Sequence, residues 1–371
     1  MFIRFFKKNF FIENNFFLKF SILTIVLFFF VAIFSYIIIP DNSVNANSVN
    51  VEIQSMKPGF KSKLLLIPNL EYKKKITDNF FGSRHIIRSY AIVDYRFEDD
   101  KIIYQKYNNN ENDVVEESID IQNFFRYEHR NNVHNNVREM QNLIVDKYII
   151  NRTFYFGTDI YGRCLFSRVI LGSRVSISIG FIAVFISFFI GVFLGSFAGY
   201  FGGIFDNIVM YIINVFWSIP TLLLVIAITL ILGKGFWQVY VAIGLSVWVD
   251  VARIVRGKVK SEVNKNYVNS SRLFGFNHLI IIFNHIIPNI LPSILIICAS
   301  NFASSILLES GLSFLGIGSQ PPIPSWGYMI KENYQYLILG NAYLVLIPAL
   351  FLTLLVSSFI FISNHYSSKV L

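Results

Sequence analysis

The chain has 371 residues, of which 54% are hydrophobic, 17% aromatic and only 15% charged. Soluble domains carry about a quarter charged residues, so a single water-soluble domain is disfavoured. The 39 Phe and 19 Tyr also exclude a disordered chain, because disordered sequences carry little apolar surface. The composition therefore predicts a protein that places much of its apolar surface in a lipid bilayer.

The net charge of +9 suggests a nucleic acid or an anionic membrane surface as partner. The basic residues flank long apolar runs and form no stripe interleaved with aromatic residues, which favours the bilayer and predicts no nucleic-acid partner. The two cysteines, Cys164 and Cys298, have no CxxC or Cys/His spacing. A disulfide framework is therefore excluded, and we expect no bound metal and no cofactor.

Six apolar runs approach the length of about 20 residues that a helix needs to cross a bilayer. They are residues 20–39, 175–201, 207–233, 235–249, 286–308 and 342–362. The fourth run reaches bilayer length only if Asp250, Val251 and Ala252 are included. Pro220 in the third run favours a kink, because proline removes a helical hydrogen bond. The first run is too long for a cleaved signal peptide, and no small-residue cleavage site follows it.

Basic residues in short flanking segments predict the orientation of the spans. The N-terminal tail and residues 253–272 are rich in Lys and Arg, and both are cytoplasmic if six spans alternate. We therefore expect an all-α integral membrane fold with six transmembrane helices, a helical cytoplasmic loop and a small mixed extracytoplasmic insert after the first span. The expected divisions are the cytoplasmic N-terminus with the first transmembrane helix at 1–40, the extracytoplasmic insert at 41–156, a core with five transmembrane helices at 157–364 and a cytoplasmic tail at 365–371.

The insert is rich in Asn, Lys, Asp and Glu. Residues 90–97 and 101–107 have the pattern of two strands, with a turn at 98–100 between them. His129 and His134 lie among asparagines, but no carboxylate or third histidine completes a set of metal ligands. We interpret both histidines as solvated loop residues and the insert as a small domain that contains a hairpin.

Gly191, Gly195 and Gly199 recur every four residues along the second apolar run, so they lie on one face of a helix. Without side chains on that face, another helix backbone can approach closely. Two interpretations stay open at this point. The glycine row faces either a second subunit or another helix of the same chain.

Several motifs that would carry chemistry are missing from the sequence. No Asp, Glu, Lys or Arg lies at the middle of a predicted span, which disfavours a carrier coupled to protons or sodium. No HExxH, GxSxG or pair of intramembrane carboxylates occurs, so we expect no catalytic residue and no enzyme activity. Gly157 and Gly162 have the spacing of a phosphate-binding loop, but Arg163 and Cys164 follow where Lys and Ser or Thr are needed. If ATP drives this protein, another chain must hydrolyse it.

The loop after the fourth run has the pattern of two short helices. Residues 264–274 can form the first, Gly275 is a suitable left-handed terminator, and Asn277 can cap the second. One face of the second helix is expected to carry Leu279, Ile282, Phe283 and Ile286. The loop is either an interfacial segment lying on lipid or a docking site for a cytoplasmic partner, in which Gly275 permits close approach.

Six groups of motifs occur in register over residues 150–362, a little over half of the chain. They are Gly157-Thr158-Asp159 with Gly162-Arg163 and Ser167-Arg168; Ala198-Gly199-Tyr200-Phe201-Gly202-Gly203 followed by Asp206; Ile219-Pro220; Tyr267-Val268 through Arg272 and Gly275; His285-Ile286-Ile287-Pro288-Asn289; and Leu312-Ser313-Phe314-Leu315-Gly316-Ile317-Gly318 with Gln320-Pro321-Pro322 and Pro324-Ser325-Trp326-Gly327. With these motifs the chain resembles the C-type permease subunits of dipeptide, oligopeptide and nickel ABC importers.

The resemblance implies that the cytoplasmic loop is a coupling helix that docks on an ATPase. The implied ATPase-coupling residues are Tyr267, Asn269, Ser270, Ser271, Arg272, Gly275, His285, Pro288 and Asn289. Two departures from the family pattern concern charge. Asn269-Ser270-Ser271 stands where the family usually has Glu-Ala-Ala, and Cys164 where it usually has Asp. No substrate-binding residue is implied.

The resemblance also implies a place in the bacterial inner membrane, with both termini in the cytoplasm. The implied partners are two ABC ATPase subunits, a homologous second permease subunit and an extracytoplasmic substrate-binding protein. The implied cargo is a dipeptide or oligopeptide, with nickel or another small solute as the alternative. A rival interpretation is a membrane-anchored scaffold or assembly protein whose exported insert binds a partner. A channel comes third, because the sequence shows no ring of charges or filter loop.

Overall fold

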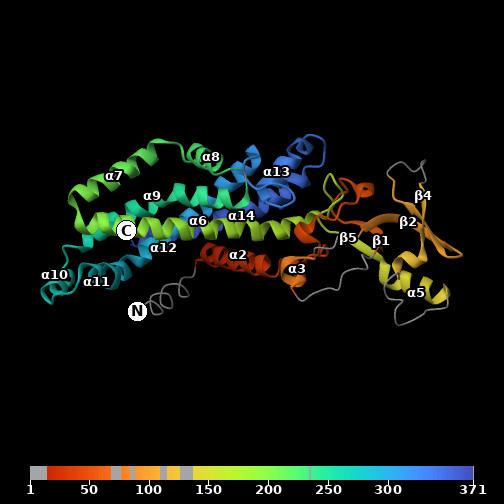
Figure 1. Cartoon of the computed structure of the whole chain (residues 1–371), viewed down its shortest axis with the longest axis horizontal. Coiled ribbons are helices and arrows are strands. Elements are labelled where there is room, and N and C mark those ends of the chain that lie inside the picture. The colour runs from red at the N-terminus through yellow and green to blue at the C-terminus, as the bar shows by residue number, and fades with distance from the viewer. Residues whose placement is uncertain are drawn as a thin grey trace. The chain divides into compact units, whose positions relative to one another are not determined.

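The computed structural model describes residues 15–67, 77–83, 88–108, 115–125, 137–233 and 235–370 (Figure 1). The chain forms two compact units. The helical unit comprises Met1–Phe30, Ser176–Gln320 and Leu352–Leu371, and the sheet unit comprises Val31–Val175 and Pro321–Phe351. His129, His134 and the first fourteen residues lie outside the described residues.

Five helical segments among the described residues are long and apolar enough to cross a membrane. They are α2 (Phe16–Ile33), α6 (Leu165–Phe201), α9 (Phe236–Glu262), the continuous segment His278–Leu315 that ends with α12 (Ile287–Leu315), and α14 (Tyr343–Val370). A sixth is present only if α7 (Gly203–Ser218) and α8 (Thr221–Leu232), which are bent by 98°, count as one span. The expected third span is therefore a broken helix.

The break between α7 and α8 follows from Pro220. Proline disfavours a helical backbone at the residue before it, and Ile219 is extended, with φ −99° and ψ 129°. The chain then turns and restarts as α8 directly after the proline. The sequence therefore predicts the position of the break, although not its large angle.

Several helix boundaries differ from those expected. Helix α2 ends at Ile33, and the short helix α3 (Ser35–Ile38) follows it. Helix α6 begins ten residues earlier than expected, and α9 continues to Glu262. Charged residues near helix ends hide such extensions from a search for uncharged runs. Helix α12 also continues past 308 and contains Glu309, which is buried and accepts hydrogen bonds from Ser313 Oγ (2.6 Å) and Ser319 Oγ (2.9 Å).

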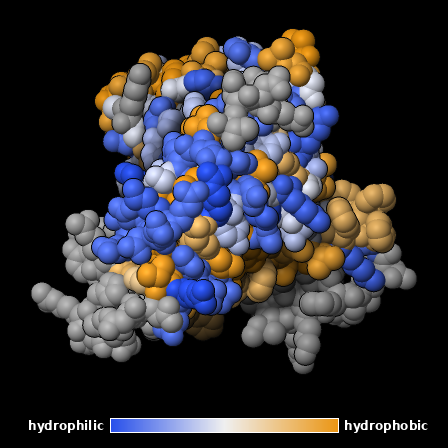
Figure 2. Space-filling view, turned by 90° about the vertical axis from the view of Figure 1, so that its right-hand side faces the viewer, coloured by the Kyte–Doolittle hydropathy of each residue, from blue (hydrophilic) through white to orange (hydrophobic). Residues whose placement is uncertain are grey.

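The insert contains an antiparallel sheet in the strand order β4-β3-β2-β1-β5. Its strands are β1 (Phe60–Ile67), β2 (Arg88–Glu98), β3 (Lys101–Lys106), β4 (Glu116–Asp120) and β5 (Ile149–Phe154). The expected hairpin is present as β2 and β3, while the other three strands were not expected. Helix α5 (Val137–Tyr148) packs against β1 and β5, and Leu65, Ile102 and Ile144 belong to the core beneath it. The exposed surface of the insert is mainly hydrophilic (Figure 2).

Shorter helices connect these elements. They are η1 (Val44–Ala46), η2 (Val51–Ile53), α4 (Asp78–Phe81), η3 (Ile121–Phe124), α10 (Asn266–Leu273), α11 (His278–Ile280), the π-helix η5 (Ile281–Ile286), α13 (Trp326–Asn333) and η6 (Tyr334–Leu337). In the helical unit, α9 packs against α12 and α8. Helices α10 and α11, which lie between α9 and α12 in the chain, are at one end of the helical unit (Figure 1).

Candidate functional site

Residues 263–286, which we name the connector, join the end of α9 to the start of α12 and contain nearly all the expected coupling residues. The first expected helix is present as α10, and it ends as Gly275 adopts a left-handed backbone with φ +77°. The Asn277 side chain accepts a hydrogen bond from the Leu279 N–H and caps α11. The local backbone of the connector is therefore encoded by a glycine and an asparagine.

Glu262 is the polar centre of the connector. Its buried carboxylate accepts hydrogen bonds from Lys265 Nζ (2.5 Å), Tyr267 Oη (2.7 Å) and Asn289 Nδ2 (2.9 Å). Burial and the hydrogen bond to Glu262 raise the pKa of the Tyr267 hydroxyl to about 12. One carboxylate thus ties α9, α10 and the first turn of α12 together, and we name these four side chains the Glu262 hub.

A second set of contacts ties the connector to the end of α6. Tyr200 Oη lies 2.8 Å from His278 Nδ1, and the Arg272 guanidinium lies 5.2 Å from the centroid of the Tyr200 ring. A cation at that distance is attracted to the face of the ring. The connector is therefore anchored to α6 as well as to α9 and α12.

The apolar side of the connector differs from the expected one. Of the four residues expected on one face, Ile282 and Ile286 are buried, but Leu279 is 48% and Phe283 43% exposed. Ile281 is buried in their place. The expectation assumed an α-helical period, whereas the π-helix bonds each residue to the fifth along and so rotates the buried face.

The opposite side of the connector carries an exposed apolar tip, formed by Leu273, Phe274 and Phe276. Leu273 is 90% and Phe274 81% exposed, and a Cβ at Gly275 would meet no atom of the described residues within 4 Å. Large apolar side chains exposed together are typical of a surface that another protein covers. Leu273 and Phe274 lie in the helix of residues 267–274 that was expected to dock, but neither was singled out as a site residue. Two bulky residues between a polar run and a glycine are a signal that could have identified them.

The other expected coupling residues surround this tip or lie beneath it. Asn269 and Ser270 are exposed on α10, and Ser271 is buried with its Oγ donating to the Tyr267 carbonyl (2.9 Å). The His285 ring lies 5.6 Å from the Phe276 ring, and its Nδ1 is buried without a hydrogen bond. Pro288 is exposed at the second residue of α12, directly after the π-helix.

The glycine row lies against α9 of the same chain. A Cβ on Gly191 would come within 2.6 Å of Val251 Cβ, and one on Gly199 within 2.6 Å of the Arg256 carbonyl oxygen, while one on Gly195 would lie even closer to the Ala252 carbonyl oxygen. Real Cβ atoms essentially never lie closer than 3.0 Å to such neighbours. The three glycines therefore permit the close approach of α6 and α9.

An ion pair fixes α7 beside the same part of α9. Both nitrogens of the Arg256 fork, Nε and Nη2, donate to the Asp206 carboxylate, at 2.5 and 2.6 Å. Such bidentate pairs have a defined geometry. Asp206 follows the Gly202-Gly203 motif, so the residues that carry the resemblance also hold the α6–α7 turn in place.

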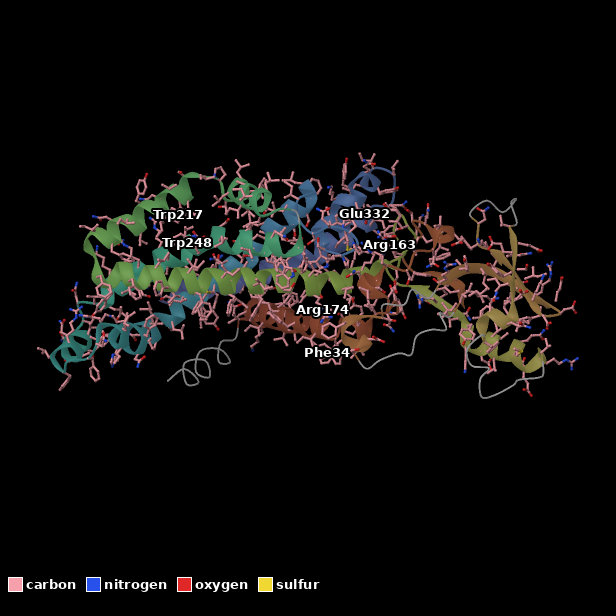
Figure 3. The ribbon with its side chains drawn as sticks, in the orientation of Figure 1. Phe34, Arg163, Arg174, Trp217, Trp248 and Glu332 are labelled. Atoms are coloured by element: carbon pink, nitrogen blue, oxygen red, sulfur yellow. The ribbon has the colours of Figure 1, made fainter. Side chains whose placement is uncertain are left out.

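A buried charge cluster occupies the sheet unit, where two of the resembling motifs meet (Figure 3). Arg163 Nε donates to Asp159 Oδ2 (2.6 Å), and Arg163 Nη2 donates to Glu332 Oε2 (2.9 Å). Arg168 is 1% exposed, with nitrogens 3.6 and 3.9 Å from the same two carboxylates. Trp326 Nε1 donates to the Val169 carbonyl (2.9 Å). Two arginines and two carboxylates thus join residues 157–169 to α13.

The described residues contain no group of three or more His, Cys, Asp or Glu side chains arranged to hold a metal ion. The polar clusters are instead made of ion pairs and hydrogen bonds between helices. These contacts fix the positions of the helices that they join.

The sequence of residues 191–371 matches the family described as "Binding-protein-dependent transport system inner membrane component". A curated relative is 40% identical over 210 residues, which are 57% of this chain and 69% of the relative. The chain therefore belongs to this family of inner-membrane transport components, and the resemblance found in the sequence is confirmed. Residues 41–156 lie outside the family match.

That relative is the oligopeptide transport system permease protein OppC of Salmonella typhimurium. The dipeptide transport system permease protein DppC of Bacillus subtilis is 39% identical over 205 residues, which are 55% of this chain and 64% of that protein. The matched part thus spans about two thirds of the length of these relatives. A solved structure of the MetNI methionine ABC transporter in an inward-facing conformation aligns at 20% identity with a TM-score of 0.44, over 55% of this chain and 96% of that chain.

Proposed function

We propose that this chain is a transmembrane subunit of an ATP-driven importer of dipeptides or oligopeptides and forms half of the translocation pathway. The observation that carries the proposal is the connector, whose exposed apolar tip is joined to three helices through the Glu262 hub and Tyr200. The peptide cargo is proposed because the two relatives described above are named for oligopeptide and dipeptide transport.

The proposed complex contains two ATPase subunits, a homologous second permease subunit and an extracytoplasmic substrate-binding protein. In it, the chain lies in the inner membrane as a protein of six spans, with both termini and the connector in the cytoplasm. The chain itself hydrolyses no ATP. The basic residues around the connector support this orientation, because such residues mark cytoplasmic loops.

In the proposed mechanism the ATPase subunits receive Leu273 and Phe274 in a surface pocket. Closure of the ATPase pair on ATP moves α10, and the hub transmits this movement to α9 and α12 because Glu262 bonds to residues of both α10 and α12. The spans then exchange between two arrangements whose populations depend on the nucleotide. Gly275 permits the partner to approach the connector backbone, since no group of the described residues lies within 4 Å of where its Cβ would be.

The proposal is tested by co-purification in mild detergent from the native membrane, combined with uptake of radiolabelled dipeptides. We expect a P-loop ATPase and a second permease to co-elute with the chain, and uptake to depend on it. The proposal is contradicted if the intact chain is purified without either partner and if cells that lack the chain take up dipeptides at an unchanged rate.

Gly275→Asp tests the docking role. A charged side chain enters the contact with the ATPase, so we expect uptake to be lost while the amount of chain in the membrane is unchanged. Gly340→Asp is the matched control, because Gly340 is also left-handed, with φ +86°, and a Cβ there also meets nothing within 4 Å. Equal uptake by the two variants at equal expression contradicts the docking role.

A further inference from the structure

An open cavity of about 910 Å³ lies in the helical unit between α7, α9, α12 and α14. Pockets of roughly 300–1,000 Å³ accept small organic ligands. The side chains that matter for its chemistry are Trp217, Asp250, Arg253, Lys258, Ser300 and Asn364. The cavity is thus wide enough for a short peptide, and polar groups from four helices face it.

Charges of both signs are held close together beside one aromatic ring in this cavity. The Trp217 indole Nε1 donates to Asp250 Oδ1 (3.1 Å), while the Arg253 guanidinium lies 4.0 Å from the Trp217 ring centroid. Trp217 is labelled on α7 in Figure 3. The ring therefore positions a carboxylate and a guanidinium that are one helical turn apart on α9.

The two cations of the cavity are not used in the ion pairs formed by the described residues, which involve neither Arg253 nor Lys258. By contrast, Arg256 and Lys260 on the same helix both lie near Asp206. Arg253 and Lys258 are thus available to an anionic group of a ligand. A carboxylate is well suited, because a guanidinium can donate two parallel hydrogen bonds to it.

We propose that this cavity is a cargo site that binds a short peptide by its free termini. Arg253 and Lys258 hold the terminal carboxylate, and Asp250 holds the terminal ammonium group. Ser300 and Asn364 supply a hydroxyl and an amide for the peptide backbone. This inference rests on the proposed function for the identity of the cargo, and it assigns to the chain cargo-contacting residues.

Asp250 distinguishes a peptide from the headgroup of an anionic lipid. Both ligands match the two cations, but the Asp250 carboxylate repels a phosphate and attracts an ammonium group. Removal of its charge therefore weakens the binding of a peptide with a free N-terminus and strengthens that of an anionic lipid. The sign of the effect of Asp250→Asn identifies the ligand.

The experiment uses the whole importer complex with a Ser293→Cys substitution, which places a thiol in the cavity wall at a residue with no proposed role in binding. The rate at which a water-soluble maleimide labels this thiol is measured with increasing concentrations of the dipeptide Ala-Phe, of its N-acetylated form and of its C-terminal amide. The complex without the introduced cysteine gives the background from Cys164 and Cys298, both of which are buried.

We expect Ala-Phe to protect the thiol at concentrations about tenfold lower than either blocked form, which is the effect of one charge-assisted hydrogen bond. Asp250→Asn is expected to remove the preference over the acetylated form, and Arg253→Gln the preference over the amide. Lys147→Gln, which removes an exposed charge from α5 in the insert, is the matched control and should retain both preferences.

Equal protection by all three peptides, or protection by none, overturns the inference. Protection by vesicles of phosphatidylglycerol that is stronger in Asp250→Asn also overturns it and assigns the cavity to lipid. Peptide uptake by the unsubstituted complex is measured in parallel. If uptake fails while Ala-Phe protects the thiol, the proposed function is wrong and the site stands; if uptake proceeds without protection, only the inference is wrong.

Discussion

Asp159 in the sheet unit and Glu262 in the helical unit are buried carboxylates that both accept hydrogen bonds from three groups, but their partners differ. The arginines around Asp159 are themselves buried. Around Glu262, the Lys265 side chain is 53% exposed and Asn289 is also exposed. Asp159 is thus surrounded by buried arginines, while Glu262 has partners that are exposed to solvent.

The surroundings of Asp159 favour a rigid contact, and those of Glu262 allow movement. Breaking a buried ion pair is costly, because the charge left behind cannot be solvated. The Asp159 cluster is therefore a permanent link between distant segments. The partners of Glu262 can exchange their hydrogen bonds for water at a lower cost, so the hub can rearrange during a transport cycle.

The largest effect is expected for Asp159→Asn, which leaves Arg163 and Arg168 buried with one carboxylate fewer. We expect the free energy of unfolding to fall by about 3–5 kcal/mol, measured as a lower thermal midpoint and faster proteolysis of the sheet unit. Glu98→Gln is the control, because its pair with Arg96 is more than half exposed and exposed ion pairs contribute little to stability. Similar stability of the two variants would show that the cluster is not the permanent link.

An intermediate effect is expected for Glu262→Gln, which keeps the shape of the hub and removes its charge. Hydrogen bonds to charged groups are stronger than those to neutral ones, so we expect peptide uptake to fall about tenfold, equivalent to about 1.4 kcal/mol. ATP hydrolysis by the complex should continue. Tyr267→Phe removes one of the three donors and should have a smaller effect, so a larger loss in that variant contradicts the role of the carboxylate.

The smallest effect concerns pH and the surface of the insert. Hydrogen bonds from the Lys106 ammonium group and the Tyr104 hydroxyl lower the pKa of Glu117 below its ordinary value of 4.5. A lowered folded-state pKa stabilises the fold above that ordinary value, and the contribution disappears as the pH falls through the folded-state pKa. Hydrogen exchange in β3 and β4 should therefore accelerate slightly below about pH 4.5, and Glu117→Gln should remove this part of the pH dependence. An unchanged pH dependence in the variant would exclude Glu117 as its source.

Features set by neighbouring residues were predictable from the sequence. The apolar runs predicted the long helices, Pro220 the break, and Gly275 and Asn277 the connector turns, because each acts on its own stretch of backbone. The hairpin of β2 and β3 was predictable for the same reason.

Features set by distant contacts were not predictable. Strand β1 pairs with β5 across more than 80 residues, and no local turn signals that pairing. Glu262 looks like one of several solvated charges in the sequence, and only the return of α10 and α12 buries it. The buried side of the π-helix was missed because a change of helical period has no clear signature in composition.

The break at Ile219 and Pro220 restricts which side of the chain can touch lipid. Helix α8 starts afresh there, so the N–H groups of its first turn have no carbonyl one turn earlier to bond with. The hydrocarbon core of a bilayer contains no hydrogen-bond acceptor for these N–H groups. Irregular backbone at membrane depth is therefore tolerated only against protein or water. If α7 and α8 together form one span, we therefore expect the backbone at Ile219 to face protein or water and not the acyl chains.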